Sequence, residues 1–184
     1  MIIIGITGTI GAGKGTIVDY LIEHKSFSHY SVREYLISII EDKNLPVNRD
    51  SMVIVANELR AMHSPSFIIE ELYKQAVVKG NNCIIESIRT PGEIEALRKM
   101  ESFYLFAVDA EPQLRYNRIL QRASETDNIS FQTFVENEKR EMNSQDPNKQ
   151  NLSKCIEQAD FVFKNDSSKE NLFFNIESVI RKLL

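Results

Sequence analysis

Residues 2–16 read Ile2-Ile3-Ile4-Gly5-Ile6-Thr7-Gly8-Thr9-Ile10-Gly11-Ala12-Gly13-Lys14-Gly15-Thr16. The isoleucine-rich beginning is typical of a short strand buried on both faces of a sheet. The glycine-rich middle allows the backbone to take positive φ angles and to approach a ligand closely. A helical pattern starts near Lys14. Strand, glycine loop and helix in this order are the context that a phosphate-binding loop, or P-loop, requires.

The residue types of this loop suit an anionic ligand. Successive N–H groups in a glycine loop can point inward at a phosphate, and the helix N-terminus adds partial positive charge. Lys14 is expected to reach the β and γ oxygens of ATP, while a hydroxyl at the helix start helps hold Mg²⁺. Gly15 stands where the strict pattern has Ser or Thr, so we assign that hydroxyl to Thr16. The loop residues predicted to bind ATP are Gly8, Gly11, Ala12, Gly13, Lys14, Gly15 and Thr16.

Outward from the loop, strand-length apolar runs alternate with segments of helical periodicity, as in a parallel α/β sheet. The predicted strands are Ile2–Ile6, Ser28–Val32, Cys83–Ser87, Tyr104–Val108 and Phe161–Lys164. We therefore expect an α/β fold, a three-layer α/β/α sandwich around a five-stranded parallel sheet. The length of 184 residues fits one domain, residues 1–184.

Helix boundaries are marked by capping patterns. Thr90, Pro91 and Glu93 have the spacing of a capping box with proline in the first turn. Ser167 and Glu170 repeat the cap before the last helix, and Gly80 is placed to end a helix over 67–79.

Two segments lie outside the expected sheet. Residues 44–79 form a predicted helical insertion that binds the phosphoryl acceptor. Residues 124–150 are polar at both ends and form a predicted lid, with a short helix over 130–142.

Composition excludes several classes of function. A net charge of −4 and a pI near 5.5 give no basic surface for a nucleic-acid polymer. Cys83 and Cys155 form neither a CxxC pair nor a zinc pattern, and the three histidines share no metal-ligand spacing. The apolar run at 1–6 is too short for a signal peptide or membrane span, so we expect a cytoplasmic protein without a membrane partner. The sequence does not indicate the oligomeric state.

The ending Gly13-Lys14-Gly15-Thr16 resembles the loop of adenylate-kinase-like nucleoside monophosphate kinases. The segment 84–90 is similar to that family's strand with a terminal acid followed by an Arg-Thr pair. The resemblance implies that Glu86 is a Walker-B-type acid that contacts Mg²⁺ with Thr16. It also implies that Arg89 holds the acceptor's phosphate; a simple Glu86–Arg89 ion pair is the alternative.

Two later tracts extend the resemblance. Arg115, Arg118 and Arg122 share a helix face in a segment similar to the one that leads into the family's lid. The resemblance implies that Arg118 stacks on the base of ATP and that Arg122 reaches its phosphates; a solvated basic stripe is the alternative, above all for Arg115. The tract 159–166 resembles the last strand of dephospho-coenzyme A kinases and of an uncharacterised archaeal group, which implies that Asn165 borders the base of ATP.

The acceptor side departs from the adenylate-kinase pattern. The expected Thr-Gly-Asp turn after the second strand is replaced by a stretch that contains Arg33, and the insertion offers Arg49 and Arg60. We expect Arg33 and Arg60, ahead of Arg49, to join Arg89 in binding the acceptor.

The predicted function is transfer of the γ-phosphoryl group of ATP, with Mg²⁺, to a nucleoside monophosphate or similar phosphorylated nucleoside. The predicted catalytic residues are Lys14, Arg89, Arg122 and Arg140. Dephospho-coenzyme A kinase is one alternative, although Gly15 counts against it, and a non-catalytic ATP-binding regulatory module is another.

Overall fold

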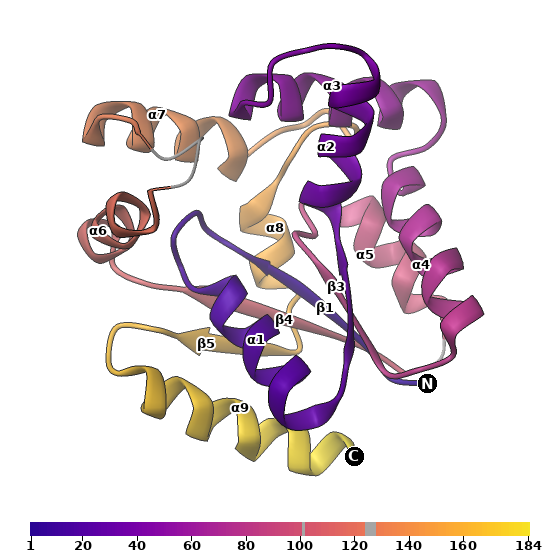
Figure 1. Cartoon of the computed structure of the whole chain (residues 1–184), viewed down its shortest axis with the longest axis vertical. Coiled ribbons are helices and arrows are strands. Elements are labelled where there is room, and N and C mark those ends of the chain that lie inside the picture. Colours follow the sequence, from indigo (N-terminus) through magenta and orange to yellow (C-terminus); the bar gives the residue numbers. More distant parts are fainter. Residues whose placement is uncertain (101, 124–127) are drawn as a thin grey trace.

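The computed structural model describes residues 1–100, 102–123 and 128–184, and all five predicted strands are present in it (Figure 1). They are β1 (Ile3–Gly8), β2 (Ser28–Ser31), β3 (Cys83–Glu86), β4 (Phe103–Asp109) and β5 (Phe161–Lys164). The last strand has the predicted ends. The second strand ends one residue early because the Ser31 side chain already caps the next helix, accepting from the Glu34 amide at 3.2 Å.

The strands form one five-stranded parallel sheet, as predicted, and their order is β2-β3-β1-β4-β5. In register, Glu86 at the end of β3 pairs with Ile6 of β1 and Ser31 of β2. Strand β1 continues for two residues beyond Ile6 and ends at Gly8, where the P-loop begins. Polar residues that follow β1, β2 and β3 therefore meet at the carboxyl edge of the sheet, where open α/β sheets bind their ligands.

Helices fill the remainder of the sequence between the strands. They are α1 (Lys14–Lys25), α2 (Val32–Asp42), α3 (Arg49–Met62), α4 (Phe67–Lys79), α5 (Pro91–Arg98), α6 (Pro112–Arg122), α7 (Phe131–Met142), α8 (Leu152–Glu157) and α9 (Lys169–Leu183). The insertion at 44–79 is helical, as predicted. In the described ranges, no helix is long and apolar enough to cross a membrane.

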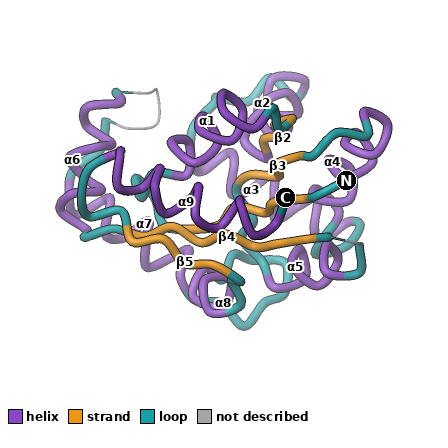
Figure 2. Tube along the Cα trace, turned by 90° about the horizontal axis from the view of Figure 1, so that it is seen from below, coloured by secondary structure: helices purple, strands orange, loops and turns teal. Residues whose placement is uncertain are grey.

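Two apolar cores separate the three layers. Because successive strand residues point to opposite faces, Ile3 joins one core and Ile4 the other. Helices α1 and α9 cover the Ile4 face with Leu21 and Ile176, whereas α4, α5 and α8 cover the Ile3 face. Figure 2 shows α1 on one side of the strands and α5 and α8 on the other.

The capping predictions hold with one correction. Thr90 and Glu93 form the capping box of α5, and Gly80 ends α4 with φ 72°. The last helix, however, is capped by Ser168, whose hydroxyl accepts from the Asn171 amide. Ser167 instead accepts from the Asn171 side chain at 2.7 Å, because the helix begins one residue later than the sequence spacing implied.

Candidate active site

The P-loop has the backbone geometry of a phosphate cradle. Gly11 and Gly13 have φ of 75° and 109°, a region that side chains disfavour. A Cβ at Gly13 would lie 2.3 Å from the Asn165 amide nitrogen, and one at Gly11 would lie 2.5 Å from the Arg115 carbonyl oxygen. A Cβ at Gly15 would meet nothing within 4 Å. The loop thus needs glycine at positions 11 and 13, and its geometry fits a phosphate chain.

Lys14 is folded back onto its own loop. Its Nζ donates to the carbonyl oxygens of Gly8 and Thr9, at 2.9 Å each. Burial, together with the positive charge of Arg89, lowers the pKa of Lys14 to about 7. A desolvated ammonium with two carbonyl partners is poised to exchange them for an anion, since phosphate oxygens carry more negative charge.

Glu86 faces the same pocket from the end of β3. Its carboxylate lies 3.2 Å from the ring nitrogen Nε2 of His29. Burial by itself raises the pKa of Glu86, but the hydrogen bond to His29 and the charge of Lys14 outweigh it and hold the pKa below its ordinary value. The sequence offered no signal for His29, because only the parallel pairing of β2 with β3 brings it to Glu86. Among the described residues, Glu86 does not pair with Arg89, so the simple ion-pair alternative fails.

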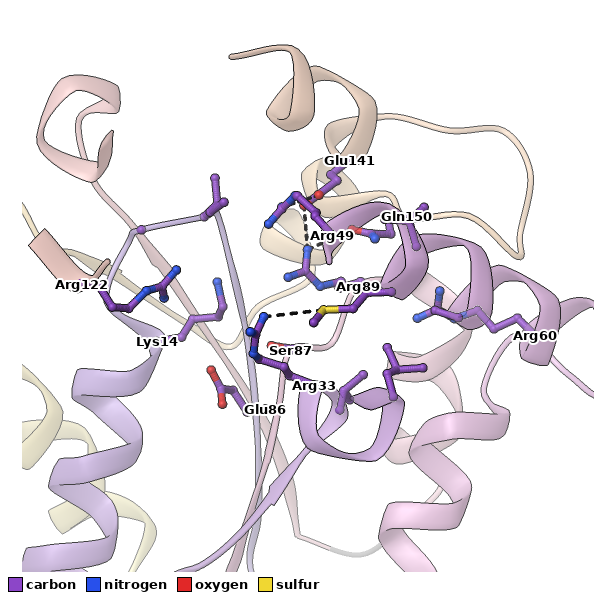
Figure 3. A pocket seen from close by; sticks show the side chains of 17 residues that line it. Lys14, Arg33, Arg49, Arg60, Glu86, Ser87, Arg89, Arg122, Glu141 and Gln150 are labelled. Carbon is purple, nitrogen blue, oxygen red and sulfur yellow. Dashed lines mark hydrogen bonds and ion pairs between the residues drawn. The ribbon is translucent and has the colours of Figure 1, made fainter. Parts of the chain in front are cut away.

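Arg89 belongs to a charged network that crosses the pocket (Figure 3). Its Nη1 donates to Glu141 of α7 at 2.7 Å and to the Gln150 side chain at 2.9 Å. The other carboxylate oxygen of Glu141 accepts from Arg49, the first residue of α3. We call Arg49, Arg89, Glu141 and Gln150 the arginine clamp. Glu141 and Gln150 were not among our predicted site residues and Arg49 was ranked below Arg33 and Arg60, because the clamp partners lie 52 to 92 positions apart in the sequence.

Arg60 lines the pocket but is no surface residue. Its side chain is only 1% exposed and that of Glu93 is 0% exposed. The Nε and Nη2 atoms of Arg60 both donate to one oxygen of Glu93, at 3.2 and 2.8 Å. The other oxygen of Glu93 accepts from the backbone N–H groups of Arg89 and Thr90. Glu93, which the sequence predicted only as a helix cap, therefore also holds the side chain of Arg60 and the backbone of Arg89.

Arg33 and Arg122, two further predicted site residues, line this pocket. Arg33 contacts the sulfur of Met52 at 3.6 Å. The wall between the charged groups is apolar and consists of Val32, Leu36, Met52, Val53 and Ala56 from α2 and α3. Figure 3 shows Lys14 and Arg122 at one end of the pocket and Arg60 at the other, with Arg89 between them.

The residues predicted for the base of ATP form a separate group. Arg118 donates from Nη2 to the carbonyl of Asn165 at 2.8 Å, and the Asn165 side chain donates to the Ala12 carbonyl at 2.8 Å. These two residues, like Gly8, Ala12, Gly13, Gly15 and Thr16, are not among those that line the pocket. Thus the structure brings Arg118 and Asn165 to the P-loop, but neither lines the pocket that contains the arginine clamp.

Arg115 is a structural residue of the loop. It is 3% exposed, and its guanidinium donates to the carbonyl oxygens of Ala110 and Ile10. It also pairs with Glu138 of α7 at 2.7 Å. The alternative of a solvated basic stripe is therefore wrong for Arg115.

Helix α7, the predicted helix within the lid, is docked against its neighbours. Phe134 is fully buried beside Ile10 and Ile119, and Arg140 pairs with Asp50 of α3 at 3.0 Å. Arg140 is exposed and is not among the pocket-lining residues. Residues 124–127, the predicted first hinge, lie outside the described residues.

The metal prediction rests on two oxygen donors. The part of the chain that the structure describes holds no cluster of three or more His, Cys, Asp or Glu side chains arranged for a metal ion. Mg²⁺ that is bound through substrate phosphates needs only one or two protein oxygens. Thr16 at the start of α1 and Glu86 at the end of β3 remain the two predicted oxygen donors.

Comparisons with known proteins agree with the fold. A family model described as an AAA domain matches residues 4–144. The UPF0200 protein of Methanococcus vannielii is 27% identical over 187 residues, which cover 100% of this chain and 97% of that protein. A gluconokinase from Sinorhizobium meliloti 1021 has a TM-score of 0.57 at 10% identity, over 99% of this chain and 93% of that chain. A shikimate kinase from Bacteroides thetaiotaomicron has a TM-score of 0.54 at 15% identity, over 98% of both chains. The chain thus has a P-loop, kinase-like fold.

Proposed function

We propose that this chain, which belongs to the AAA domain family whose model spans residues 4–144, is an ATP-dependent kinase with a phosphorylated nucleoside as acceptor. The observation that carries the proposal is the meeting of Lys14, Glu86 and Arg89 in one pocket at the carboxyl edge of the sheet. A P-loop lysine, a carboxylate that suits Mg²⁺ and an arginine are the groups that phosphoryl transfer needs.

The ATP side is assigned to the loop and its neighbours. The backbone N–H groups around Gly11 and Gly13 hold the phosphates, while Arg118 and Asn165 border the base. Thr16 and Glu86 hold Mg²⁺, which when bound neutralises charge on the transferring phosphoryl group. Lys14 leaves the carbonyl oxygens of Gly8 and Thr9 to bind the phosphate oxygens.

The charge of the pocket favours an acceptor that already carries phosphate. Cationic side chains outnumber acidic ones among the pocket-lining residues, although the whole chain has a net charge of −4. A phosphate monoester carries nearly two negative charges near neutral pH, whereas the carboxylic acids in the names of the structurally similar kinases, shikimate and gluconate, carry one. The excess of arginines in the pocket therefore matches a phosphorylated acceptor better than either of these acids.

Transfer depends on position and charge more than on a general base. Lys14, Arg89 and Arg122 surround the phosphoryl group as it moves. We propose that the described part of the predicted lid, residues 128–150, closes over it and excludes water, which suppresses hydrolysis of ATP. Arg140 can contact the phosphoryl group only after its ion pair with Asp50 breaks, so its catalytic role requires a movement of α7.

An ADP-release assay across possible acceptors tests the proposal. The acceptors are nucleoside monophosphates, their deoxy forms, dephospho-coenzyme A, shikimate and gluconate. We expect ADP release that depends on a nucleoside monophosphate. Release with dephospho-coenzyme A or a sugar acid alone would assign a different kinase, and ATP binding without acceptor-dependent release would indicate a regulatory module.

A further inference from the structure

One nitrogen of Arg60 has no hydrogen-bond partner among the residues that the structure describes. Nε and Nη2 are both held by Glu93, but Nη1 is buried and makes no hydrogen bond to any described group. Leaving a buried donor of a charged group unpaired costs free energy that a ligand oxygen can recover. Arg60 is among the residues that line the pocket, so its unpaired nitrogen marks a place where a ligand atom belongs.

The position of Arg60 indicates which part of a ligand it meets. Figure 3 places it at the end of the pocket opposite Lys14, beyond Arg89. The same pocket has the apolar wall from α2 and α3, which suits the faces of a flat ring. An acceptor with its phosphate near Arg89 and its ring on this wall would therefore direct the far edge of the ring at Arg60.

A guanidinium has hydrogen-bond donors only. Arg60 can therefore pair with a carbonyl oxygen at that edge, whereas an exocyclic amino group would present a second donor to it. The neighbouring Glu93 cannot compensate, because its two oxygens already accept from Arg60, Arg89 and Thr90.

From these contacts we propose that Arg60 determines base specificity by donating from Nη1 to a carbonyl oxygen of the acceptor's base. The inference rests on the proposed function, and it narrows the substrate class. The preferred acceptors are nucleoside monophosphates with a 6-oxopurine or 4-oxopyrimidine base, and those with an amino group at that position are selected against. Glu93 links this contact to the backbone of Arg89, so the base end and the phosphate end of the pocket share one buried carboxylate.

Calorimetric titration of the full chain tests the inference without relying on turnover. Inosine 5′-monophosphate and adenosine 5′-monophosphate are a matched pair, because they differ at position 6 of the purine; uridine and cytidine monophosphates form the pyrimidine pair. The ATP site is first saturated with Mg²⁺ and a non-hydrolysable ATP analogue. We expect the oxo member of at least one pair to bind about tenfold more tightly or better, the scale of one hydrogen bond to a charged group.

Two variants assign the preference to Arg60. Arg60→Lys keeps a positive charge beside Glu93 but removes the guanidinium, and we expect the oxo-to-amino ratio to fall to about one. If that variant does not fold, Arg60→Met combined with Glu93→Gln removes both buried charges and keeps the cap of α5, because Gln also serves at N3 of a capping box. Arg98→Lys, on the surface of α5 beside Asp160, is the matched control and should leave the ratio unchanged.

The outcomes separate this inference from the proposed function. Equal binding of the two members of each pair, tighter binding of the amino members, or a ratio that survives the change at Arg60 overturns the inference alone. An oxo preference without ADP release supports the inference and refutes the kinase. If none of the four monophosphates binds, both are wrong.

Discussion

Replacement of Glu141 by Gln would measure how strongly the arginine clamp holds α7 to the rest of the fold. The Glu141 side chain is 3% exposed and bridges Arg49 and Arg89, each 20% exposed. Removing one partner from a buried charged network costs about 3–5 kcal/mol. Gln keeps one carbonyl oxygen for one arginine, and both guanidinium groups reach water, so we expect a loss below that range, about 2 kcal/mol.

Urea unfolding measures this loss. For a domain of this size, about 2 kcal/mol corresponds to a midpoint shift of about 1 M urea. Glu58→Gln is the matched control, since Glu58 pairs with Lys43 at the surface and both side chains are nearly half exposed. We expect no measurable shift for that control.

The difference in stability between wild type and Glu141→Gln should also depend on pH, and the pKa of Glu141 gives the direction of that dependence. Burial alone raises the pKa of Glu141, but the charges of Arg89 and Arg49 and their hydrogen bonds hold the pKa below its ordinary value. The unfolded chain therefore takes up the proton first as the pH falls. The stabilising effect of Glu141 is complete above about pH 4.3, the ordinary pKa of a glutamate, and is lost as the pH falls through the lower folded-state value.

The stability gap between wild type and Glu141→Gln should accordingly close in acid. Equal midpoints for Glu141→Gln and Glu58→Gln at neutral pH would refute the reasoning. A gap that stayed constant from neutral pH to pH 3 would also refute it.

Three further predictions concern the proposed ligands. Lys14→Ala should abolish ADP release and weaken ATP binding without lowering the urea midpoint, because it removes a desolvated cation; unchanged turnover would contradict the phosphate role. Thr16→Ala should weaken the Mg²⁺ dependence of turnover more than Gly15→Ser does, since a Cβ at Gly15 meets no neighbour; the reverse order would move the metal hydroxyl to position 15. Arg89→Ala should lower kcat/KM for the acceptor by tenfold or more, about 1.5 kcal/mol, while Arg118→Ala should act on ATP; equal effects on both ligands would remove the distinction.

Local chemistry explains what could be predicted from the sequence. Short apolar runs predict the strands of the sheet. Glycines at positions that need positive φ predict the loop, and a capping box within four residues predicts the start of α5. Each of these features depends on neighbours in the sequence. The early end of β2 and the cap at Ser168 show the limit, since competing side chains moved both boundaries by one residue.

The site was only partly predictable because its contacts join distant segments. Glu141 gave no sign of its partners, which stand 52 and 92 positions away. Arg60 was predicted to bind the acceptor, but its burial depends on Glu93, 33 positions later in the sequence. His29 contacts Glu86 because β2 lies beside β3 in the sheet, and no local pattern specifies that order of strands.

The position of Glu93 has a consequence for how this protein can evolve. Replacement of Arg60 by an uncharged residue leaves a carboxylate buried without its cation, and replacement of Glu93 by an apolar residue leaves both Arg60 and the start of α5 without their partner. Either intermediate loses stability, so the two positions can change only together or after stabilising changes elsewhere have accumulated. Natural drift in this region should therefore be slow, and laboratory evolution of a new acceptor should begin from libraries that vary positions 60 and 93 at the same time.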